Sequence, residues 1–220
     1  MWALWVIAAL VLTVGSVGEG QAEDALSTRP LLTIARNDLS TILPPDSHIL
    51  IDPRSIEQFL DALDGTPPDW GLVYGHGHHD PAHDERLFTL NRERDAKRAA
   101  RSALTWRLAF AWAGELSSYK PELGGFPVAL GPKFIKTRWG MVRFKPEEAP
   151  SNLVAIADAV QRDRLKQQLE AGKSVEIDVV MIGKLIPEES IMYDFSHDEE
   201  GLGLIMPFVR IERVVFVMAP

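Results

Sequence analysis

Large apolar side chains recur at every second residue from Leu104 to Trp112, and this pattern constrains the fold of the chain more than any other feature. They alternate with smaller residues along the run Leu104-Thr105-Trp106-Arg107-Leu108-Ala109-Phe110-Ala111-Trp112. A period of two places the large side chains on one face of a β-strand, and Trp and Phe favour strands. The sequence therefore predicts a long strand here, although the helical segment before it could be read as continuing through it.

More strands are expected after this one, and helices on both sides of it. Residues 126–130 follow the turn at 121–125 as the second strand of a hairpin, and the runs 175–182 and 204–217 also alternate. Shorter extended pieces are expected at 31–34, 47–51, 71–74 and 141–144, and helices at 53–63, 84–101 and 158–171.

The turns between these strands set the expected topology. Strands joined by short turns pair antiparallel, because a parallel pair needs a crossover of about a dozen residues or more. Only the helix at 158–171 offers such a crossover. The predicted fold class is α+β, with two or three helices after an N-terminal signal peptide. Its sheet is expected to be curled and mostly antiparallel, and a small open barrel is one form that such a sheet can take.

The N-terminus indicates export. No charged side chain occurs in residues 1–17, the stretch 2–14 is almost wholly apolar, and small residues follow as far as Ala22. This is the layout of a signal peptide that is cut after Ala22. Two alternatives stay open, a membrane anchor at 2–17 and a buried core helix, although a membrane span needs about 20 apolar residues. We expect a periplasmic or extracellular protein, with the membrane as a partner only if this segment is retained.

Composition bounds the rest of the chain. The 220 residues include no cysteine, so no disulfide holds the fold and its own core must do so. We predict a signal peptide at 1–22 and a single globular domain at 23–220, made of a lead-in with helices and a histidine-rich loop (23–101) and a β-rich body (102–220). The net charge of −8 argues against nucleic acid as a partner.

One segment of this acidic protein is basic. The second half of the expected helix at 84–101 carries five cations against only Glu93 and Asp95; the cations are Arg92, Arg94, Lys97, Arg98 and Arg101. The simpler interpretation is a solvated helix with some ion pairs along its surface. The alternative is a docking surface for an anionic partner.

The densest group of reactive side chains lies between Tyr74 and Glu85. Four of the six histidines of the chain fall within eight positions, along His76-Gly77-His78-His79-Asp80-Pro81-Ala82-His83. Imidazole is the commonest metal ligand, and on an extended segment His76, His78 and Asp80 would point to one side. The candidate metal ligands are therefore His76, His78, Asp80 and His83, and zinc is the candidate ion. A plain polar loop is the competing interpretation.

The run His76-Gly77-His78-His79-Asp80 resembles the H-x-H-x-D start of the metal motif in metallo-β-lactamase-like hydrolases. The resemblance covers about 35 residues from Leu50 onward. It implies that His76, His78 and Asp80 act as zinc ligands or as the acid that activates a zinc-bound water. The chain departs from the family pattern at Pro81, where the family has histidine, and offers only His197 as a downstream ligand.

Other signals for chemistry are incomplete. The stretch 193–200 contains Ser, His and Asp in a row, but catalytic triads assemble across a fold, so we interpret it as an acidic loop between two strands. Residues 201–204 are too short for a phosphate-binding glycine loop. Trp106 and Trp139 are expected in the core. Catalytic residues thus stay unknown, and no organic cofactor is predicted.

The predicted function is that of an exported, non-catalytic binding or accessory module of the cell envelope, with an unidentified protein or small molecule as its partner. The alternative is a zinc-dependent hydrolase that uses His76, His78 and Asp80.

Overall fold

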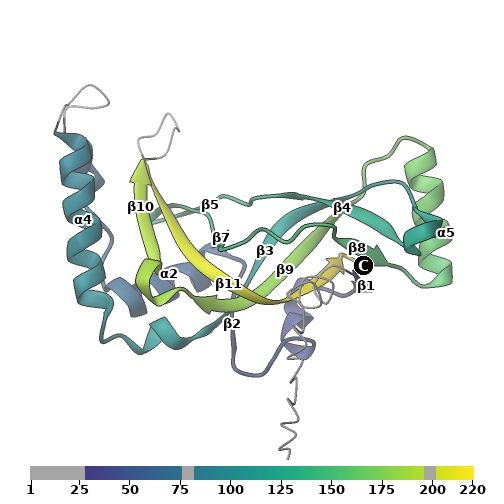
Figure 1. Ribbon diagram of the computed structural model, residues 1–220, viewed down its shortest axis with the longest axis horizontal. Helices are drawn as coiled ribbons and strands as arrows, with labels where there is room; N and C mark the ends of the chain where they lie inside the picture. Colours follow the sequence, from purple (N-terminus) through teal and green to yellow (C-terminus); the bar gives the residue numbers. More distant parts are fainter. Residues whose placement is uncertain (1–27, 76–81, 196–201) are drawn as a thin grey trace, which may run out of the picture.

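The computed structural model describes residues 28–75, 82–195 and 202–220 (Figure 1). Six strands of a mixed sheet close into a barrel, which confirms the predicted α+β fold with a curled sheet. Around the barrel the order is β1 (Thr28–Thr33), β8 (Val154–Ile156), β4 (Phe126–Gly131), β3 (Arg107–Leu116), β9 (Glu176–Leu185) and β11 (Gly203–Met218), which returns to β1.

The strands joined by short connections pair antiparallel, as expected. β3 pairs with β4 and β9, and β9 pairs with β11, all antiparallel. The expectation of at most one parallel crossover was wrong, because β1–β8, β1–β11 and β2–β3 are parallel, as are β11–β6 and β11–β7. These pairs join strands that are distant in the chain, where the length of a local turn sets no direction. The strands β1 and β2 (Ser47–Leu50) thereby attach the lead-in to the β-rich body.

The long strand β11 belongs to two sheets. Its second half pairs with β9 and β1 in the barrel, and its first half pairs with short strands outside it. A bulge at Glu212 shifts the register between the two halves, and such bulges bend a strand. The short strands are β5 (Ile135–Thr137), β6 (Gly140–Val142), β7 (Lys145–Pro146) and β10 (Ile191–Phe195), of which β5 pairs with β6 and the other three with β11.

The alternating run at 104–112 confirms the strand predicted there, although β3 begins only at Arg107. Leu108, Phe110 and Trp112 face the main core cluster, and Ala109 faces a second cluster on the other side of the sheet. The short 3-10 helix η2 (Ser102–Thr105) precedes the strand. The second cluster is covered by the chain around η1 (Arg36–Thr41) and β2. Two further 3-10 turns are η3 (Pro121–Leu123) and η4 (Pro187–Glu189).

All three expected helices are present, and one was missed. They are α2 (Pro53–Asp64), α4 (His83–Arg98) and α5 (Ala159–Glu170). Residues 71–74, expected as a strand, instead lie in the short helix α3 (Trp70–Tyr74), because the Asp69 side chain accepts the backbone N–H of Leu72 and starts a helical turn. A four-residue apolar run carries too little periodicity to separate the two states.

The described helices include none that is long and apolar enough to cross a membrane. The predicted signal peptide at 1–22 lies outside the described residues, so export stays a prediction.

The start of α2 yields a test of the fold. The Asp52 side chain accepts the backbone N–H of Ser55, and the Ser55 hydroxyl oxygen accepts the backbone N–H of Asp52, which completes a capping box. The hydrogen bond from the Ser55 backbone holds the pKa of Asp52 below its usual value. Asp52→Ala should therefore lower the free energy of unfolding by about 1 kcal/mol near neutral pH, measured by urea denaturation.

The pH dependence of that loss has a definite sign. A lowered folded-state pKa contributes stability above the unfolded value of about 3.9, and this contribution disappears as the pH falls through the folded-state pKa. The difference between wild type and Asp52→Ala should shrink on acidification. Asp52→Asn keeps a capping oxygen and serves as the control, and a loss equal to that of Asp52→Ala would contradict the cap.

Candidate functional site

Three of the four predicted metal ligands, His76, His78 and Asp80, lie outside the described residues, as does His197. The fourth, His83, is the first residue of α4. Its Nε2 lies 3.1 Å from a carboxylate oxygen of Asp84, and its ring meets the Phe195 ring edge-on with centroids 4.8 Å apart. In the described part of the chain, no three His, Asp or Glu side chains are grouped so that they could hold a metal ion.

The ends of the two histidine-bearing segments meet in the described structure. The Tyr74 hydroxyl donates to the backbone oxygen of Leu202 at 3.0 Å, and the rings of Tyr74 and Phe195 lie 4.7 Å apart. The described residues that flank 76–81, Tyr74 and His83, therefore lie against those that flank 196–201, Phe195 and Leu202. Nothing in the sequence pattern predicted this contact.

A groove lies between α4 and β10. It encloses about 390 Å³, within the range of small ligand sites. Two large apolar side chains stand exposed in it, Phe88 from α4 at 61 % and Met192 from β10 at 43 %. Leu87, Ile191 and Phe208 complete an apolar floor.

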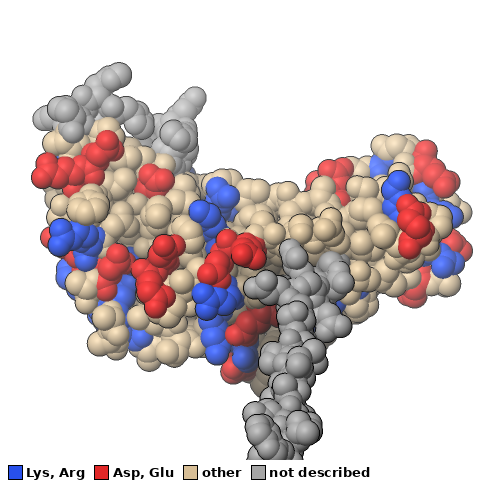
Figure 2. All heavy atoms as spheres, viewed as in Figure 1, with Lys and Arg blue, Asp and Glu red and all other residues tan. Residues whose placement is uncertain are grey.

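Carboxylates surround this floor. The groove is lined by five acids, namely Asp84 and Asp95 of α4, Glu188 and Glu189 of η4, and Asp194 of β10. Two cations border it, because Arg92 lies over the Phe88 ring and Lys145 over the Phe208 ring. Figure 2 shows acidic side chains gathered over α4 and near β10 on the visible face. Burial raises the pKa of Asp95, and the charge of Asp64 adds to this, although Arg98 opposes it. The groove therefore combines apolar anchoring surface with an excess of carboxylates over cations.

The outer edge of β10 is paired with side chains of α4 rather than with another strand. The Asn91 carboxamide donates to the Tyr193 carbonyl oxygen at 2.9 Å and accepts the Tyr193 N–H at 2.8 Å. Arg98 donates to the Ile191 carbonyl oxygen at 3.0 Å. An unpaired strand edge can pair with strands of other chains. At the edge of β10, side chains of α4 form hydrogen bonds with the backbone groups of Tyr193 and Ile191 instead.

A buried ionic network fixes α4 against α2 and β10. Arg98 donates two hydrogen bonds to Asp64 at 2.6 and 2.9 Å, with the side chains 1 % and 0 % exposed. The Tyr193 hydroxyl donates to the same carboxylate. Arg94 lies over the rings of Trp139 and Tyr193 and donates to the carbonyl oxygens of Asp64 and Thr66.

The groups of this buried network keep one protonation state. Burial acts to lower the pKa of Arg98, but the hydrogen bonds and charge of Asp64 outweigh it, and the net pKa is raised. Burial, and then the charge of Asp64, raise the pKa of Tyr193 far above its ordinary value. The guanidinium thus stays charged and the phenol protonated at any physiological pH, so this network supports structure rather than proton transfer.

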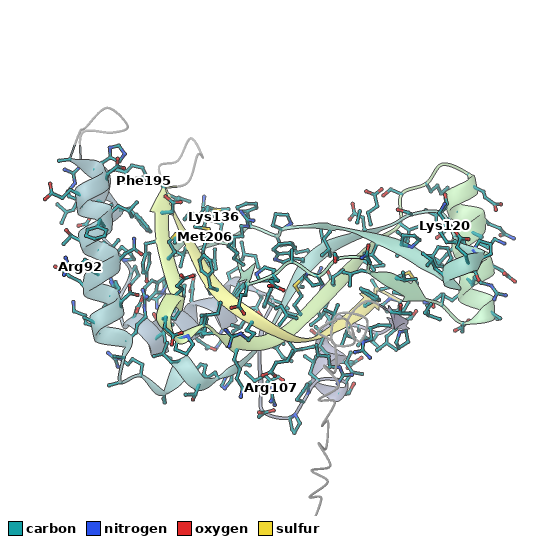
Figure 3. The ribbon with its side chains drawn as sticks, in the orientation of Figure 1. Arg92, Arg107, Lys120, Lys136, Phe195 and Met206 are labelled. Carbon is teal, nitrogen blue, oxygen red and sulfur yellow. The ribbon has the colours of Figure 1, made fainter. Side chains whose placement is uncertain are left out.

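The basic segment at 84–101 is neither a fully solvated helix nor a helix with all of its cations at the surface. Arg98 is buried and Arg94 points inward, whereas Arg92 is exposed on α4 and lies over Phe88 (Figure 3). A docking surface for an anionic partner would need these cations at the surface. The structure turns two of them inward because Asp64 and backbone carbonyl oxygens need donors there.

Tryptophans and glycines near the groove have structural roles. Trp139 is fully buried, as expected, and its indole donates to Asp61. The expected core position of Trp106 is only partly right, because it is half-buried and stacks on His48. Gly203 lies against the Trp70 ring, where a Cβ atom would come within 2.1 Å of ring carbons. The close approach of Trp70 explains why residue 203 is a glycine. The sequence alone indicated only that residues 201–204 are not a phosphate-binding loop.

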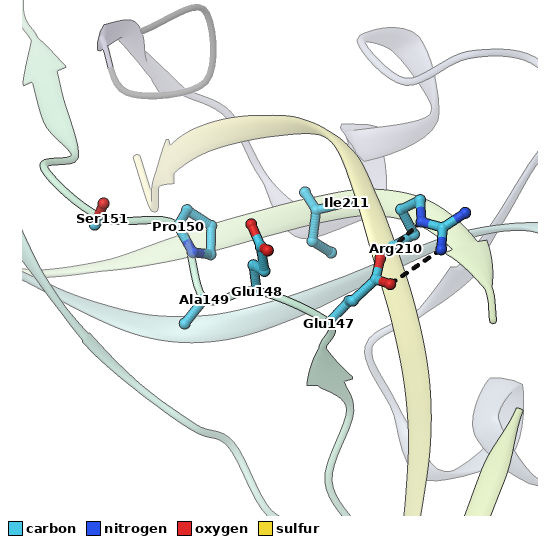
Figure 4. A pocket seen from close by; sticks show the side chains of 7 residues that line it. All are labelled: Glu147, Glu148, Ala149, Pro150, Ser151, Arg210 and Ile211. Carbon is cyan, nitrogen blue, oxygen red and sulfur yellow. Dashed lines mark hydrogen bonds and ion pairs between the residues drawn. The ribbon is translucent and has the colours of Figure 1, made fainter. Parts of the chain in front are cut away.

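A second cavity, beside β11, is smaller than the usual range of small-molecule sites. It encloses about 120 Å³ between residues 147–151 and β11, and the ion pair between Arg210 and Glu147 lies at one end of its lining (Figure 4). The hydrogen bond from Arg210 lowers the pKa of Glu147. Exposed pairs of this kind contribute little to stability.

Comparisons of this chain with protein families, with curated proteins and with solved structures gave no match. The groove is therefore the feature from which a function can be inferred. The sequence did not predict the groove, because its acids and apolar residues come from segments about a hundred positions apart.

The Arg98–Asp64 pair gives a test of how the groove is held. Removing one partner of a buried ion pair leaves an uncompensated charge, so Arg98→Met should lower the free energy of unfolding by about 3–5 kcal/mol. Lys97→Met, at an exposed position on the same helix, should change it by less than about 0.5 kcal/mol.

A double variant separates charge from packing in that test. Arg98→Met with Asp64→Leu buries no lone charge and should be more stable than Arg98→Met alone. Both comparisons use chemical denaturation. Equal stability of Arg98→Met and Lys97→Met would show that the pair does not hold α4.

Proposed function

We propose that this protein is a non-catalytic binding module of the cell envelope whose binding site is the groove between α4 and β10. Its partner is a polypeptide segment that carries apolar side chains flanked by lysine or arginine. The observation that carries this proposal is the exposure of Phe88 and Met192 inside one acid-rimmed groove.

The exposed apolar side chains of the groove floor are available for binding a partner, because they are not buried in the folded chain. Large apolar side chains gain about 25 cal/mol per Å² when they leave water, so Phe88 and Met192 each keep free energy available for association. Methionine adapts its shape to different partners, and aromatic residues are enriched at the centres of interfaces. Contiguous exposed apolar surface in a groove is typical of an interaction site.

The acids define the charge of the partner. The five lining carboxylates outnumber the two bordering cations, Arg92 and Lys145, and this excess of negative charge favours a positively charged ligand over an anionic one. Peptide segments meet this requirement when lysine or arginine flank apolar anchors. The groove also lies beside a strand edge that Asn91 already occupies, so the partner contacts side chains rather than extending the sheet.

The groove is pre-organised. Its two walls are joined by the buried pair of Arg98 and Asp64 and by the bonds of Asn91 to Tyr193. A rigid site loses less conformational entropy on binding than a mobile one. Placement in the cell envelope rests on the N-terminal segment of the sequence.

A leucine–lysine peptide tests the groove directly. Titration calorimetry should detect binding of this peptide to the protein and no binding of a leucine–glutamate peptide of equal length. Phe88→Ser and Met192→Ser should each weaken binding at least about tenfold, because each removes a central apolar anchor. Val160→Ser removes another exposed apolar side chain, on α5 (82 % exposed), and should leave the affinity unchanged. Equal binding of both peptides, or equal effects of all three variants, would overturn the proposal.

A zinc-dependent hydrolase is the second candidate, and one observation favours it. The described ends of the segments that carry His76, His78 and His197 contact each other through Tyr74, Phe195 and Leu202. The predicted ligands themselves lie outside the described residues.

Metal analysis tests that candidate. The purified protein should contain about one zinc ion per chain if the site exists, and His76→Ala and His78→Ala should each lose it without a change in thermal stability beyond that of metal removal by a chelator. His48→Ala, at a histidine that stacks on Trp106, is the matched control and should retain the metal. A metal-free wild type that stays metal-free after zinc is added would exclude the site.

A further inference from the structure

The helix α4 presents one stripe of side chains to the groove. Five of its residues line the groove at the spacing i, i+3, i+4, i+7 and i+11, namely Asp84, Leu87, Phe88, Asn91 and Asp95. Residues at this spacing lie on one face of an α-helix, because eleven residues complete about three turns. The structure describes all of α4, and its buried residue is Arg98, outside this stripe. The stripe is therefore an open helix face about 16 Å long, which is the rise of eleven residues.

The strand β10 forms the opposite wall and runs antiparallel to α4 (Figure 1). Arg98, at the last turn of α4, donates to the Ile191 carbonyl oxygen at the start of β10. His83, the first residue of α4, meets the ring of Phe195 at the end of β10. The groove between them thus has two ends, one at the start of α4 and the other at η4.

The end at the start of α4 carries two carboxylates that are open to a cation. Asp84 of α4 and Asp194 of β10 line this end. The imidazole of His83 contacts Asp84, and neither carboxylate forms an ion pair with a lysine or arginine of the described ranges. A cation of a partner is therefore expected here.

The two cations that border the groove lie toward its other end. Arg92 is three residues before Asp95, so the two are about one turn apart on α4. Lys145 lies over the Phe208 ring, and the Phe208 backbone N–H donates to the carbonyl oxygen of Ser190, directly after η4. Charges of both signs meet at this end, and they favour a cation less than the opposite end does.

The groove offers no backbone position to which an extended partner could pair. Asn91 binds both polar backbone groups of Tyr193, and Arg98 binds the carbonyl oxygen of Ile191. The Asp194 carboxylate accepts the backbone N–H of Phe195 at 2.8 Å. These are the alternate residues of β10 that face away from β11. A helix satisfies its own N–H and C=O groups, so it can lie over this groove without any backbone partner.

We infer that the partner segment is an amphipathic helix of about three turns that lies along α4, over the groove. The inference rests on the proposed function, because it specifies the partner of the same site. A groove of about 390 Å³ admits the side chains of such a helix rather than the helix itself. Its apolar residues at i, i+3, i+4 and i+7 insert between Phe88 and Met192, which is how helices are recognised in grooves. A lysine or arginine at one end of this apolar stripe lies at Asp84 and Asp194.

Two leucine–lysine peptides of equal length and composition test the helix. In one peptide the leucines recur at i, i+3, i+4 and i+7, and in the other they alternate with lysine. Calorimetry should show the first peptide binding at least about tenfold more tightly, because it alone presents its leucines on one face of a helix. Circular dichroism of the mixture should show more helix than the sum of the separate components. A proline at the centre of the first peptide should weaken its binding by a similar factor.

The outcomes separate the helix from the proposed function. Equal affinity of the two isomers, or a complex without added helical signal, would overturn the helix and leave the binding groove in place. Failure of both isomers to bind would overturn the groove itself.

The absence of cysteine from the chain allows the partner's conformation to be measured by disulfide formation. Asp84→Cys and Asp95→Cys each place one thiol in the stripe, and the first peptide carries a single cysteine at successive positions. The peptide positions that react with the two variants should differ by about eleven residues for a helix. A difference of about five residues would mean an extended partner and overturn the inference. Glu93→Cys, on the opposite face of α4, is the control and should react no faster than a free thiol.

A paired substitution tests where the partner's cation lies. Asp84→Asn with Asp194→Asn should weaken binding of the first peptide at least about fivefold, because it removes both carboxylates of that end and keeps their shape. Glu93→Gln removes an exposed carboxylate from the opposite face of α4 and should leave the affinity unchanged. Equal affinity of the two variants, with both folded by circular dichroism, would overturn the placement of the cation.

Discussion

The bidentate ion pair between Arg98 and Asp64 is the interaction on which the rest of this end of the molecule depends. It joins the end of α2 to the end of α4, and the same carboxylate receives the hydroxyl of Tyr193 from β10. Such a pair is costly to bury, and it is retained where it fixes one arrangement of elements. Here it aligns a helix of low apolar content, whose fully buried residue is Arg98 itself, along an open strand edge.

That alignment explains how exposed apolar surface can persist beside β10. The polar groups of the strand edge are satisfied by Asn91 and Arg98, so the edge cannot add strands from other molecules. Only side chains are then left for contact, and Phe88 and Met192 are surrounded by carboxylates. The acids limit non-specific apolar association and admit partners of positive charge.

The sequence predicted those parts of the fold that local periodicity determines. The alternation around Phe110, the helix at 53–63 and the turn at 121–125 all appear as expected. The parallel pairings and the closure of the barrel by β1 could not be predicted, because they join segments far apart in the chain. The groove was missed for the same reason, and the inward turn of Arg98 was hidden because its partner, Asp64, lies 34 residues away.

The strand β11 converts this distant pairing into a pattern of charge. Its first half lies between β6, which belongs to a hairpin without acids, and β10, which follows two glutamates. The basic hairpin that contains β6 and the acidic segment before β10 are separated by about fifty residues along the chain. Only the shared strand brings the cations and the carboxylates onto one face with methionine and leucine between them.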